Sequence, residues 1–390
     1  MQLPQHEPLH ENFFQCPRLE PHELEELRAM AVQNSMDLYA KSRIRGGQRD
    51  WTLCEDNKDV KIYKSEDLDH VPKWGRLFMY AATSEVVATI EEFVGLFKND
   101  TTIQAKEFSR RFISRAIDSL VLYSVLKPTK QQPHEKVSII WRAYAPTMGG
   151  KLVQNRDNCI LECHHEFSVG TRRGWIYSLV SIDLASCPNM EDRLGLVRVR
   201  DYGTGYVVLE SARRPGYLDI TYVNHADVNV GKKEWFLNSL GQKTRFAGMA
   251  LMNLCRHTSK IDQFLREDRL ARTPFLSVNE LVPLDSVGAC SLCSKKFRPW
   301  SKRLNCWKCG MVTCRNCNRP WMVKQKGYPT LTDICTKCSL CRPTDKSTES
   351  RAAPSSPSYT VATSSKFDDA TSIASHDFSS YVETEVYPNH

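Results

Sequence analysis

The sequence predicts an α+β protein, in which an antiparallel sheet carrying a long C-terminal helix is followed by a small cysteine-rich finger and a disordered tail. Three observations lead to this prediction. Between residue 51 and about residue 227, alternating or apolar runs are separated by turn residues. From residue 235 to about 267 the apolar spacing becomes helical. Eight cysteines then form four C-x2-C pairs between residues 290 and 338.

The composition is that of a globular protein. The 390 residues allow two or three domains, with 41% hydrophobic and 25% charged residues and a net charge of +8. The first fifteen residues lack the apolar run of a signal peptide, and no window approaches the roughly 20 apolar residues of a membrane span. We therefore expect a cytoplasmic protein in a reducing compartment, where paired cysteines are metal ligands and not disulfides.

The N-terminal segment, residues 1–50, is expected to contain one helix over residues 21–45. Pro21 opens it and Glu23 lies in the first turn, where an acidic side chain is favoured. Leu24, Leu27 and Leu38 recur at helical spacing, and the sequence Arg45-Gly46-Gly47 ends the pattern.

The large domain is expected over residues 51–268. We predict strands at 60–63, 120–126, 137–144, 159–167, 174–182, 205–210 and 217–222, with turns at 128–129, 148–150 and 172–174. One helix is predicted from Ser84, as N-cap, to Phe97. Strands joined by short loops favour an antiparallel meander, and the helix over residues 235–267 is expected to pack on it, although Gly241 and Gly248 each cost about 1 kcal/mol there.

The remaining segments follow from composition. Residues 269–285 are expected to be a linker, and residues 286–341 the finger. The tail, residues 342–390, contains seventeen serine or threonine residues and few large aliphatic ones. It has too little apolar area to offset the entropy of ordering, so we predict that it is disordered.

The cysteine spacing predicts two zinc sites. A C-x2-C turn places two sulfur atoms on one side of a tetrahedral ion, so four turns complete two sites. Because all eight ligands are cysteines, neither ion keeps an open position for water, which indicates structural zinc. Residues 290–341 contain no histidine, which disfavours RING and PHD fingers. Cys341 lies outside the pattern. Zinc binding of about 10–16 kcal/mol per site would supply the folding energy of this segment.

The finger resembles the FYVE zinc finger family. Its segment Lys302–Gly310 lies where that family carries its basic R-[RK]-H-H-C-R-x-C-G motif. The resemblance implies that Cys290, Cys293, Cys314 and Cys317 hold one Zn2+, and that Cys306, Cys309, Cys335 and Cys338 hold the other. It also implies binding to phosphatidylinositol 3-phosphate and a peripheral location on endosomal membranes.

The motif departs from the family pattern at several positions. Leu304-Asn305 replaces the two histidines, Trp307 replaces an arginine, and Asp333 replaces the arginine two residues before the seventh cysteine. An acid at a phosphate site is unfavourable by like-charge repulsion. We therefore expect weak binding to anionic membranes, with little preference among phosphoinositides.

A basic surface is expected to provide this membrane attraction. Eleven lysine or arginine residues lie between Ser286 and Cys341 against one acid, Asp333. Lys302, Arg303 and Lys308 are the expected headgroup contacts. Trp300 is the expected membrane-inserting side chain, with packing in the core of the finger as the alternative.

The large domain resembles START-like lipid-binding domains with a helix-grip fold, in particular those paired with FYVE-type fingers in oomycete-type proteins. The resemblance rests on four segments: Asp118 to Thr129, Arg156-Asp157-Asn158-Cys159, Ser178 to Asp183 with Cys187-Pro188, and Thr221-Tyr222-Val223. It implies a cavity for an apolar molecule. The pair Arg156-Asp157 together with Asp183 is either a ligand-orienting buried pair or a turn salt bridge.

Catalysis is not expected. The strongest local constellation is Cys163-His164-His165-Glu166, and in a strand its alternate residues point to opposite faces, giving two ligands per face. That is too few for a zinc site, and no third group is visible to orient a cysteine–histidine pair.

The sequence thus favours a non-enzymatic lipid-binding adaptor that attaches to an anionic membrane. Two alternatives stay open. The first is an interaction scaffold, with a filled large domain and a finger that binds an acidic protein. The second and weaker is nucleic-acid binding through the basic finger.

Overall fold

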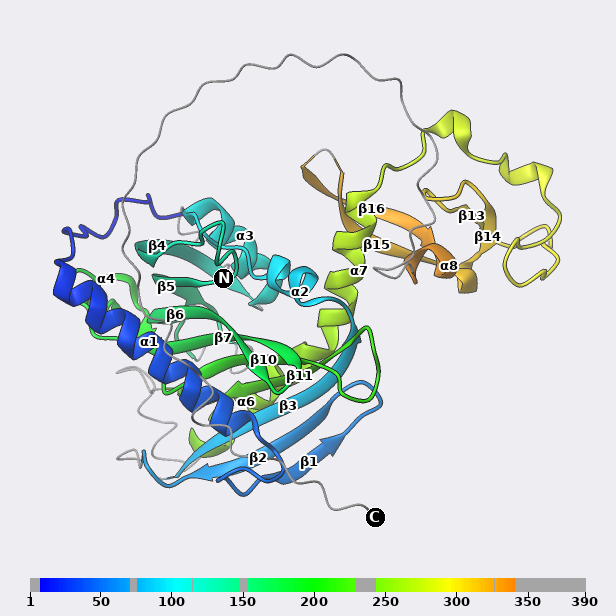
Figure 1. Ribbon diagram of the computed structural model, residues 1–390. Helices are drawn as coiled ribbons and strands as arrows, with labels where there is room; N and C mark the ends of the chain where they lie inside the picture. Colours follow the sequence, from blue (N-terminus) through cyan, green and yellow to red (C-terminus); the bar gives the residue numbers. More distant parts are fainter. Residues whose placement is uncertain are drawn as a thin grey trace, which may run out of the picture.

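The computed structural model describes residues 8–70, 76–113, 115–146, 153–228, 243–325 and 327–340. A large sheet domain is followed by a small finger, and helix α7 (Ile261–Arg272) lies between them (Figure 1). The predicted turn at 148–150, the first part of the helix expected from residue 235, Cys341 and the tail lie outside the described residues.

The described residues form one antiparallel sheet of ten strands, in which β8 alone runs parallel to its neighbour β6. The order is β1-β2-β3-β11-β10-β7-β6-β5-β4. Its strands are β1 (Thr52–Asp56), β2 (Lys61–Asp67), β3 (Leu77–Val87), β4 (Ala116–Leu126), β5 (Lys136–Tyr144), β6 (Arg156–Val169), β7 (Arg172–Ser181), β8 (Val197–Arg198), β10 (Thr204–Glu210) and β11 (Tyr217–Asn224).

The predicted strands after residue 116 are confirmed, with ends shifted by a few residues. The predicted turn at 172–174 is wrong, since β7 begins at Arg172 and the turn lies at Gly170, whose φ of 58° a glycine adopts without strain. The order is a meander from β4 to β11, extended at the β11 edge by β3, β2 and β1.

The helix predicted over residues 84–97 is partly wrong. Ser84–Val87 belongs to β3, where pairing with β11 outweighs the local helical pattern. The helix that forms is α2 (Ile90–Leu96), and Thr89 is its N-cap. The Thr89 side chain accepts from the Glu92 amide, and Glu92 accepts from the Thr89 amide, so the two residues form a capping box.

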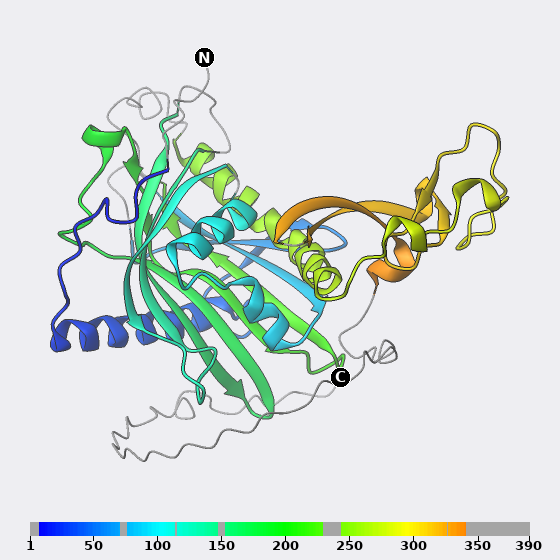
Figure 2. The same cartoon turned by 90° about the horizontal axis from the view of Figure 1, so that it is seen from above.

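Helix α1 (Pro21–Ser42) covers one face of the curved sheet (Figure 2). It begins at Pro21 as predicted and ends three residues early. Leu38 is buried among Ile176, Val207 and Val223, all from the face that α1 covers. Ser35 Oγ lies 2.8 Å from Ser178 Oγ and fixes the helix to β7.

The opposite face carries α2, α3 (Thr102–Phe112), α6 (Lys243–Arg256) and α7 (Figure 2). Phe93, Phe97 and Trp175 form the centre of the core on this side. Helix α3 was not predicted. The long C-terminal helix is confirmed as a helical region, but a 3-10 turn (His257–Lys260) divides it and α7 continues to Arg272.

The structure of this helical region moves one predicted boundary and explains one glycine. The linker begins at Thr273 and not at residue 269, because α7 includes residues 269–272. The position of Gly248 is explained by its neighbour, since a Cβ there would lie 2.7 Å from Tyr80 Oη. The sheet with its C-terminal helices has the predicted helix-grip architecture.

The finger consists of two short hairpins and a terminal turn of helix. The elements are β13 (Arg303–Asn305), β14 (Val312–Cys314), β15 (Asn318–Gln325), β16 (Tyr328–Cys335) and α8 (Thr336–Ser339). Short elements outside it are the four-residue helix α4 (Glu191–Leu194) and the two-residue strands β9 (Arg200–Asp201) and β12 (Ala226–Asp227).

Candidate functional site: two zinc centres and an apolar cavity

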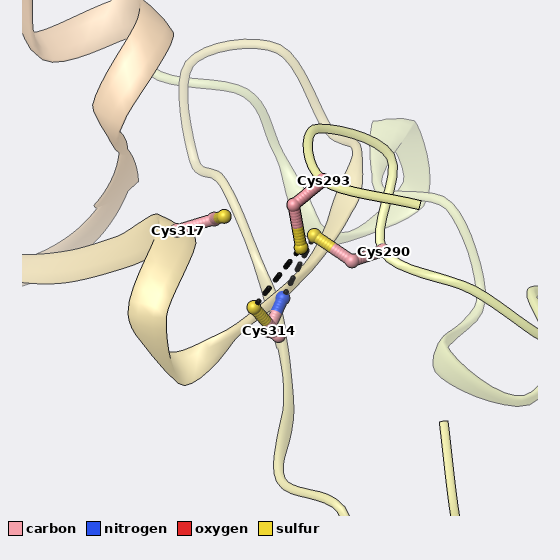
Figure 3. Close-up of side chains that lie close together, drawn as sticks. All are labelled: Cys290, Cys293, Cys314 and Cys317. Atoms are coloured by element: carbon pink, nitrogen blue, oxygen red, sulfur yellow. Dashed lines mark hydrogen bonds between the residues drawn. The ribbon is translucent and has the colours of Figure 1, made fainter. Parts of the chain in front are cut away.

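The first zinc centre is formed by Cys290, Cys293, Cys314 and Cys317, whose sulfur atoms all lie within 4.8 Å of one another. Figure 3 shows the four side chains converging on one point. Cys293 Sγ lies 3.8 Å from Cys314 Sγ. Tetrahedral sulfur ligands at about 2.3 Å from zinc are about 3.8 Å apart, so the geometry fits the ion. The Cys314 amide also donates to Cys290 Sγ at 3.3 Å.

The second zinc centre is formed by Cys306, Cys309, Cys335 and Cys338. Cys309 Sγ lies 3.9 Å from Cys335 Sγ, again the spacing of tetrahedral ligands. Backbone amides of Cys335 and Cys338 donate to sulfur atoms of the same group, which favours the thiolate form that zinc requires. Both sets agree with the crossed pairing that the family resemblance implied.

The second centre is continuous with the large domain. Leu270 of α7 is buried with Cys306, Val323, Ile334 and Cys335 in one apolar cluster. No comparable core surrounds the first centre within the described residues. The second zinc ion therefore stabilises the part of the finger that contacts α7.

The large domain contains a cavity of about 220 Å³ on the sheet face that carries α6. Aromatic side chains from the strands, among them Tyr177, Tyr206 and Tyr222, form one wall, and Ala250, Leu251 and Leu254 of α6 form another. The predicted cavity is thus present, and it opens between the sheet and the helices.

A buried charge cluster lies beside this cavity. Glu162 accepts hydrogen bonds from Arg142 Nη2 at 2.6 Å, Tyr177 Oη at 2.7 Å and Asn99 Nδ2 at 2.8 Å. Its neighbours Lys136 and His164 lie at 3.3 and 3.1 Å. Burial disfavours the charge on Glu162, but the charges of Lys136 and Arg142 outweigh it and hold the pKa of Glu162 well below its usual range.

Arg142 Nε and Asn158 Oδ1 are buried polar atoms of cavity-lining residues that have no hydrogen-bond partner within the described structure. Both side chains line the cavity, and the residues are only 3% and 8% exposed. Asn158 Nδ2 donates to Asp201 Oδ2 at 3.3 Å, which assigns the oxygen of the amide to the unpartnered side. Arg142 and Asn158 thus each bring to the cavity wall a polar group whose hydrogen-bonding capacity is incompletely used.

The other sequence-derived candidates have structural partners. Asp157 forms a buried pair with Arg198 and accepts from Trp141 Nε1 at 2.8 Å. Asp183 pairs with Arg200 at the surface. The predicted link between Arg156-Asp157 and Asp183 is therefore replaced by two separate ion pairs. Arg156 itself lines the cavity, and its Nη1 donates to the Gln154 carbonyl at 2.7 Å.

The alternation predicted for residues 163–166 is seen in β6. Cys163 lies in the cluster beneath α1, and His164 lies on the opposite face against Glu162. His165 pairs with Glu135 at 2.9 Å. These contacts separate the cysteine from His164 and give each group a structural partner.

A third group with metal-ligand side chains consists of Asp67, His70 and His225. Lys41 Nζ lies 2.7 Å from the Tyr202 carbonyl oxygen and 3.1 Å from His225 Nδ1, so an ammonium donates to both. His225 Nε2 then carries the proton that it donates to Asp67 at 2.6 Å. Hydrogen bonds thus occupy the atoms that a metal would need, and the group is a structural network.

The membrane-contact candidates have different environments. Trp300 is 88% exposed, so it is not part of the core of the finger. Lys302 is also exposed. Arg303 and Lys308, in contrast, are engaged with the chain itself, as described below.

The sequence comparison identifies the finger. Residues 280–342 match the model of the FYVE zinc finger. This segment is therefore a FYVE-type zinc finger that binds two zinc ions through the two groups of four cysteines. Comparison with curated protein sequences gave no significant match.

Three human proteins are among the solved structures to which this chain is similar. Human StAR-related lipid transfer protein 5 has 15% identity and a TM-score of 0.37, with 59% of this chain and 99% of that chain covered. Human STARD10 has 14% identity and a TM-score of 0.38, with 66% and 87% covered. The human StarD13 (DLC2) lipid transfer and protein localization domain has 13% identity and a TM-score of 0.37, with 63% and 97% covered.

Within the described residues, no helix has both the length and the apolar composition needed to cross a membrane.

Proposed function

We propose that this protein is a non-enzymatic adaptor whose large domain binds one apolar molecule with a small polar group, while its finger attaches it to an anionic membrane. The observation that carries the proposal is the cavity beside Arg142 and Asn158. Ligand sites are mostly apolar clefts with a few polar groups that orient the ligand. This cavity has that composition, since aromatic and aliphatic side chains form most of its lining and a smaller set of polar residues completes it: Arg142, Arg156, Asn158, Asp201, Thr204 and Asn224.

The unpartnered atoms define the polar group of the ligand. A buried polar atom without a hydrogen bond costs about 1–3 kcal/mol, so a ligand that satisfies Arg142 Nε and Asn158 Oδ1 recovers this cost. A hydroxyl or a primary amide both accepts and donates and meets the requirement. The nearby carboxylate of Glu162 already compensates the charge of Arg142, which favours a neutral polar group.

Blocking the cavity should remove the ligand. Ala250→Phe places a ring between α6 and the sheet. A cavity of this size cannot hold both this ring and a ligand, so we expect about a tenfold loss of co-purified apolar ligand. The measurement is organic extraction of the purified full chain followed by mass spectrometry. Met249→Phe, on the exposed side of the same helix, is the matched control.

Equal ligand content in both variants would contradict the cavity assignment. An absence of any extractable ligand from the unmodified chain, with full zinc content, would favour the interaction scaffold with a filled large domain.

Membrane attachment is assigned to the loop that carries Trp300. Lys295, Lys296, Arg298 and Lys302 are exposed around it, and each basic residue near an anionic surface contributes about 1 kcal/mol. Tryptophan is favoured at the membrane interface because its ring is apolar and its N–H is polar. Arg303 and Lys308 are left out of this surface because both bind the linker.

Trp300→Ala should weaken binding to vesicles containing phosphatidylserine by about tenfold, since burial of a large apolar side chain contributes about 1.5–3 kcal/mol. Vesicle flotation of the full chain at low salt measures the fraction of protein that binds. Tyr328→Ala, an exposed aromatic on the β15–β16 hairpin, is the control. Vesicles that carry phosphatidylinositol 3-phosphate at equal total charge should bind no more tightly. Preference for that lipid, or unchanged binding of Trp300→Ala, would contradict this assignment.

A further inference from the structure

The segment Lys302–Gly310 of the finger, called the motif strand below, contains β13 and lies where the FYVE family carries its basic motif. The linker of the same chain covers this segment. The linker, residues 273–285, follows α7 and contacts the segment Lys302–Gly310. Its last part, residues 280–285, already belongs to the segment that matches the FYVE zinc finger. The Leu276 amide donates to the Trp307 carbonyl at 3.0 Å, and the Val282 amide donates to the Gly310 carbonyl at 3.1 Å. The contact is thus made by backbone atoms at two separate points along the linker.

Side chains of the motif complete this contact. Asn305, at the position of a motif histidine, donates from Nδ2 to the Val282 carbonyl at 2.8 Å. Lys308 Nζ donates to the Thr273 carbonyl at 2.6 Å and to its hydroxyl at 2.7 Å, and lies 3.6 Å from the centre of the Phe275 ring. A cation held by oxygen atoms and an aromatic face is satisfied without a phosphate.

The remaining motif residues are used in the same way. Arg303 Nη1 donates to the Leu284 carbonyl at 3.0 Å and to Asp285 at 3.3 Å. A Cβ at Gly310 would lie 2.9 Å from the Glu280 carbonyl oxygen, so glycine permits the close approach of the linker. Its φ of 75° is also one that other residues rarely adopt.

The covered strand is joined to helix α7, which belongs to two cores. Ile261 and Leu265 are buried in the large domain against the α2 side of the sheet, and Leu270 is buried against the second zinc centre. Arg269 binds both carboxylate oxygens of Glu92 at 2.9 Å. Because α7 continues from α6 through one 3-10 turn, its position also fixes the helix that forms one wall of the cavity.

We propose that the motif strand, the segment Lys302–Gly310 of the finger, is a docking surface for the chain's own linker, residues 273–285, and that this docking holds α7, and through it the α6 wall of the cavity, in place. The contacts that Thr273 and Leu276 make with Lys308 and Trp307 join the finger to the end of α7. Release of the linker would let α7 and α6 move away from the sheet. This inference does not depend on the cavity holding a ligand.

Amide hydrogen exchange of the full chain tests the proposal, because it reports local opening. Lys308→Ala removes the bonds to Thr273, and Leu270→Ala weakens the contact from the helix side. In both variants we expect exchange of residues 261–272 to be at least tenfold faster, with two zinc ions still bound and exchange in β5 and β6 unchanged. Lys302→Ala, which changes an exposed lysine of the same segment with no hydrogen bond or ion pair to the linker in the described structure, is the matched control and should leave exchange unchanged.

The proposal is overturned if residues 261–272 exchange at the same rate in Lys308→Ala and Leu270→Ala as in Lys302→Ala. It is also overturned if β5 and β6 open together with α7, because the effect would then be global unfolding. Zinc content measured on the same samples separates a released linker from an unfolded finger, and only the first outcome supports docking.

Discussion

Cys306→Ser is expected to unfold the finger while the sheet domain stays folded. Cys306 is fully buried, holds the second zinc ion and contributes to the apolar cluster around Leu270. The finger has little core of its own, so zinc binding of about 10–16 kcal/mol per site provides its stability. A serine oxygen is a poor replacement for a thiolate, and the site is expected to lose its ion.

Limited trypsin digestion measures this effect well, because the finger contains many lysine and arginine residues. In the unmodified chain we expect them to be protected, and in Cys306→Ser we expect cleavage at least a hundredfold faster within residues 295–325 only. Cys54→Ser, which changes an exposed cysteine of β1, is the control. A protected finger in Cys306→Ser without the second zinc would show that the segment folds independently of the metal.

Glu162→Ala is expected to destabilise the sheet domain by about 3–5 kcal/mol, because it leaves Arg142 and Lys136 buried without their counter-charge. Glu162→Gln retains the shape and part of the hydrogen bonding, so its cost should be smaller. Chemical denaturation of the full chain measures both. Glu166→Ala, four residues along the same strand in a half-exposed pair with His134, should cost less than about 1 kcal/mol.

The same cluster predicts an acid dependence. The pKa of Glu162 is held below its usual range in the folded state, so the folded form binds its proton less readily than the unfolded form. Its stabilisation is therefore complete above the unfolded pKa of about 4.3 and is lost as the pH falls below that value. The stability of Glu162→Gln should decline less between pH 5 and about pH 2 than that of the unmodified chain. An identical acid profile would show that Glu162 is not ionised in the fold.

The strands and the zinc ligands were the most predictable parts of this molecule. Alternation and turn residues located β4, β5, β6, β7, β10 and β11 within a few residues but missed the two-residue strands β8 and β9, and the C-x2-C spacing located all eight sulfur ligands. Both signals are local in sequence. The segment 84–87 was predicted wrongly because its sheet partners, Asp219 and Ile220 among them, lie more than a hundred residues away.

The polar side of the cavity could not be predicted from the sequence because residues from separate strands bring it together: Arg142 lies on β5, and Asn158 and Glu162 lie on β6. Arg142 and Glu162 each follow apolar residues in a buried strand, which is the only sequence signal for them, and Asn158 belongs to the polar run Arg156-Asp157-Asn158. The docked linker was also missed. From the sequence, Lys308 was expected to contact a lipid headgroup, and only the structure shows that its ammonium group donates to Thr273 of the linker.

The central claim is that eight thiolates hold two zinc ions in a finger that is fixed to the helix closing the large domain. Native mass spectrometry of the full chain tests it most directly, because it counts bound ions on folded molecules. The account predicts one dominant species, the chain with two zinc ions. A dominant metal-free chain at the same compact charge states would contradict it.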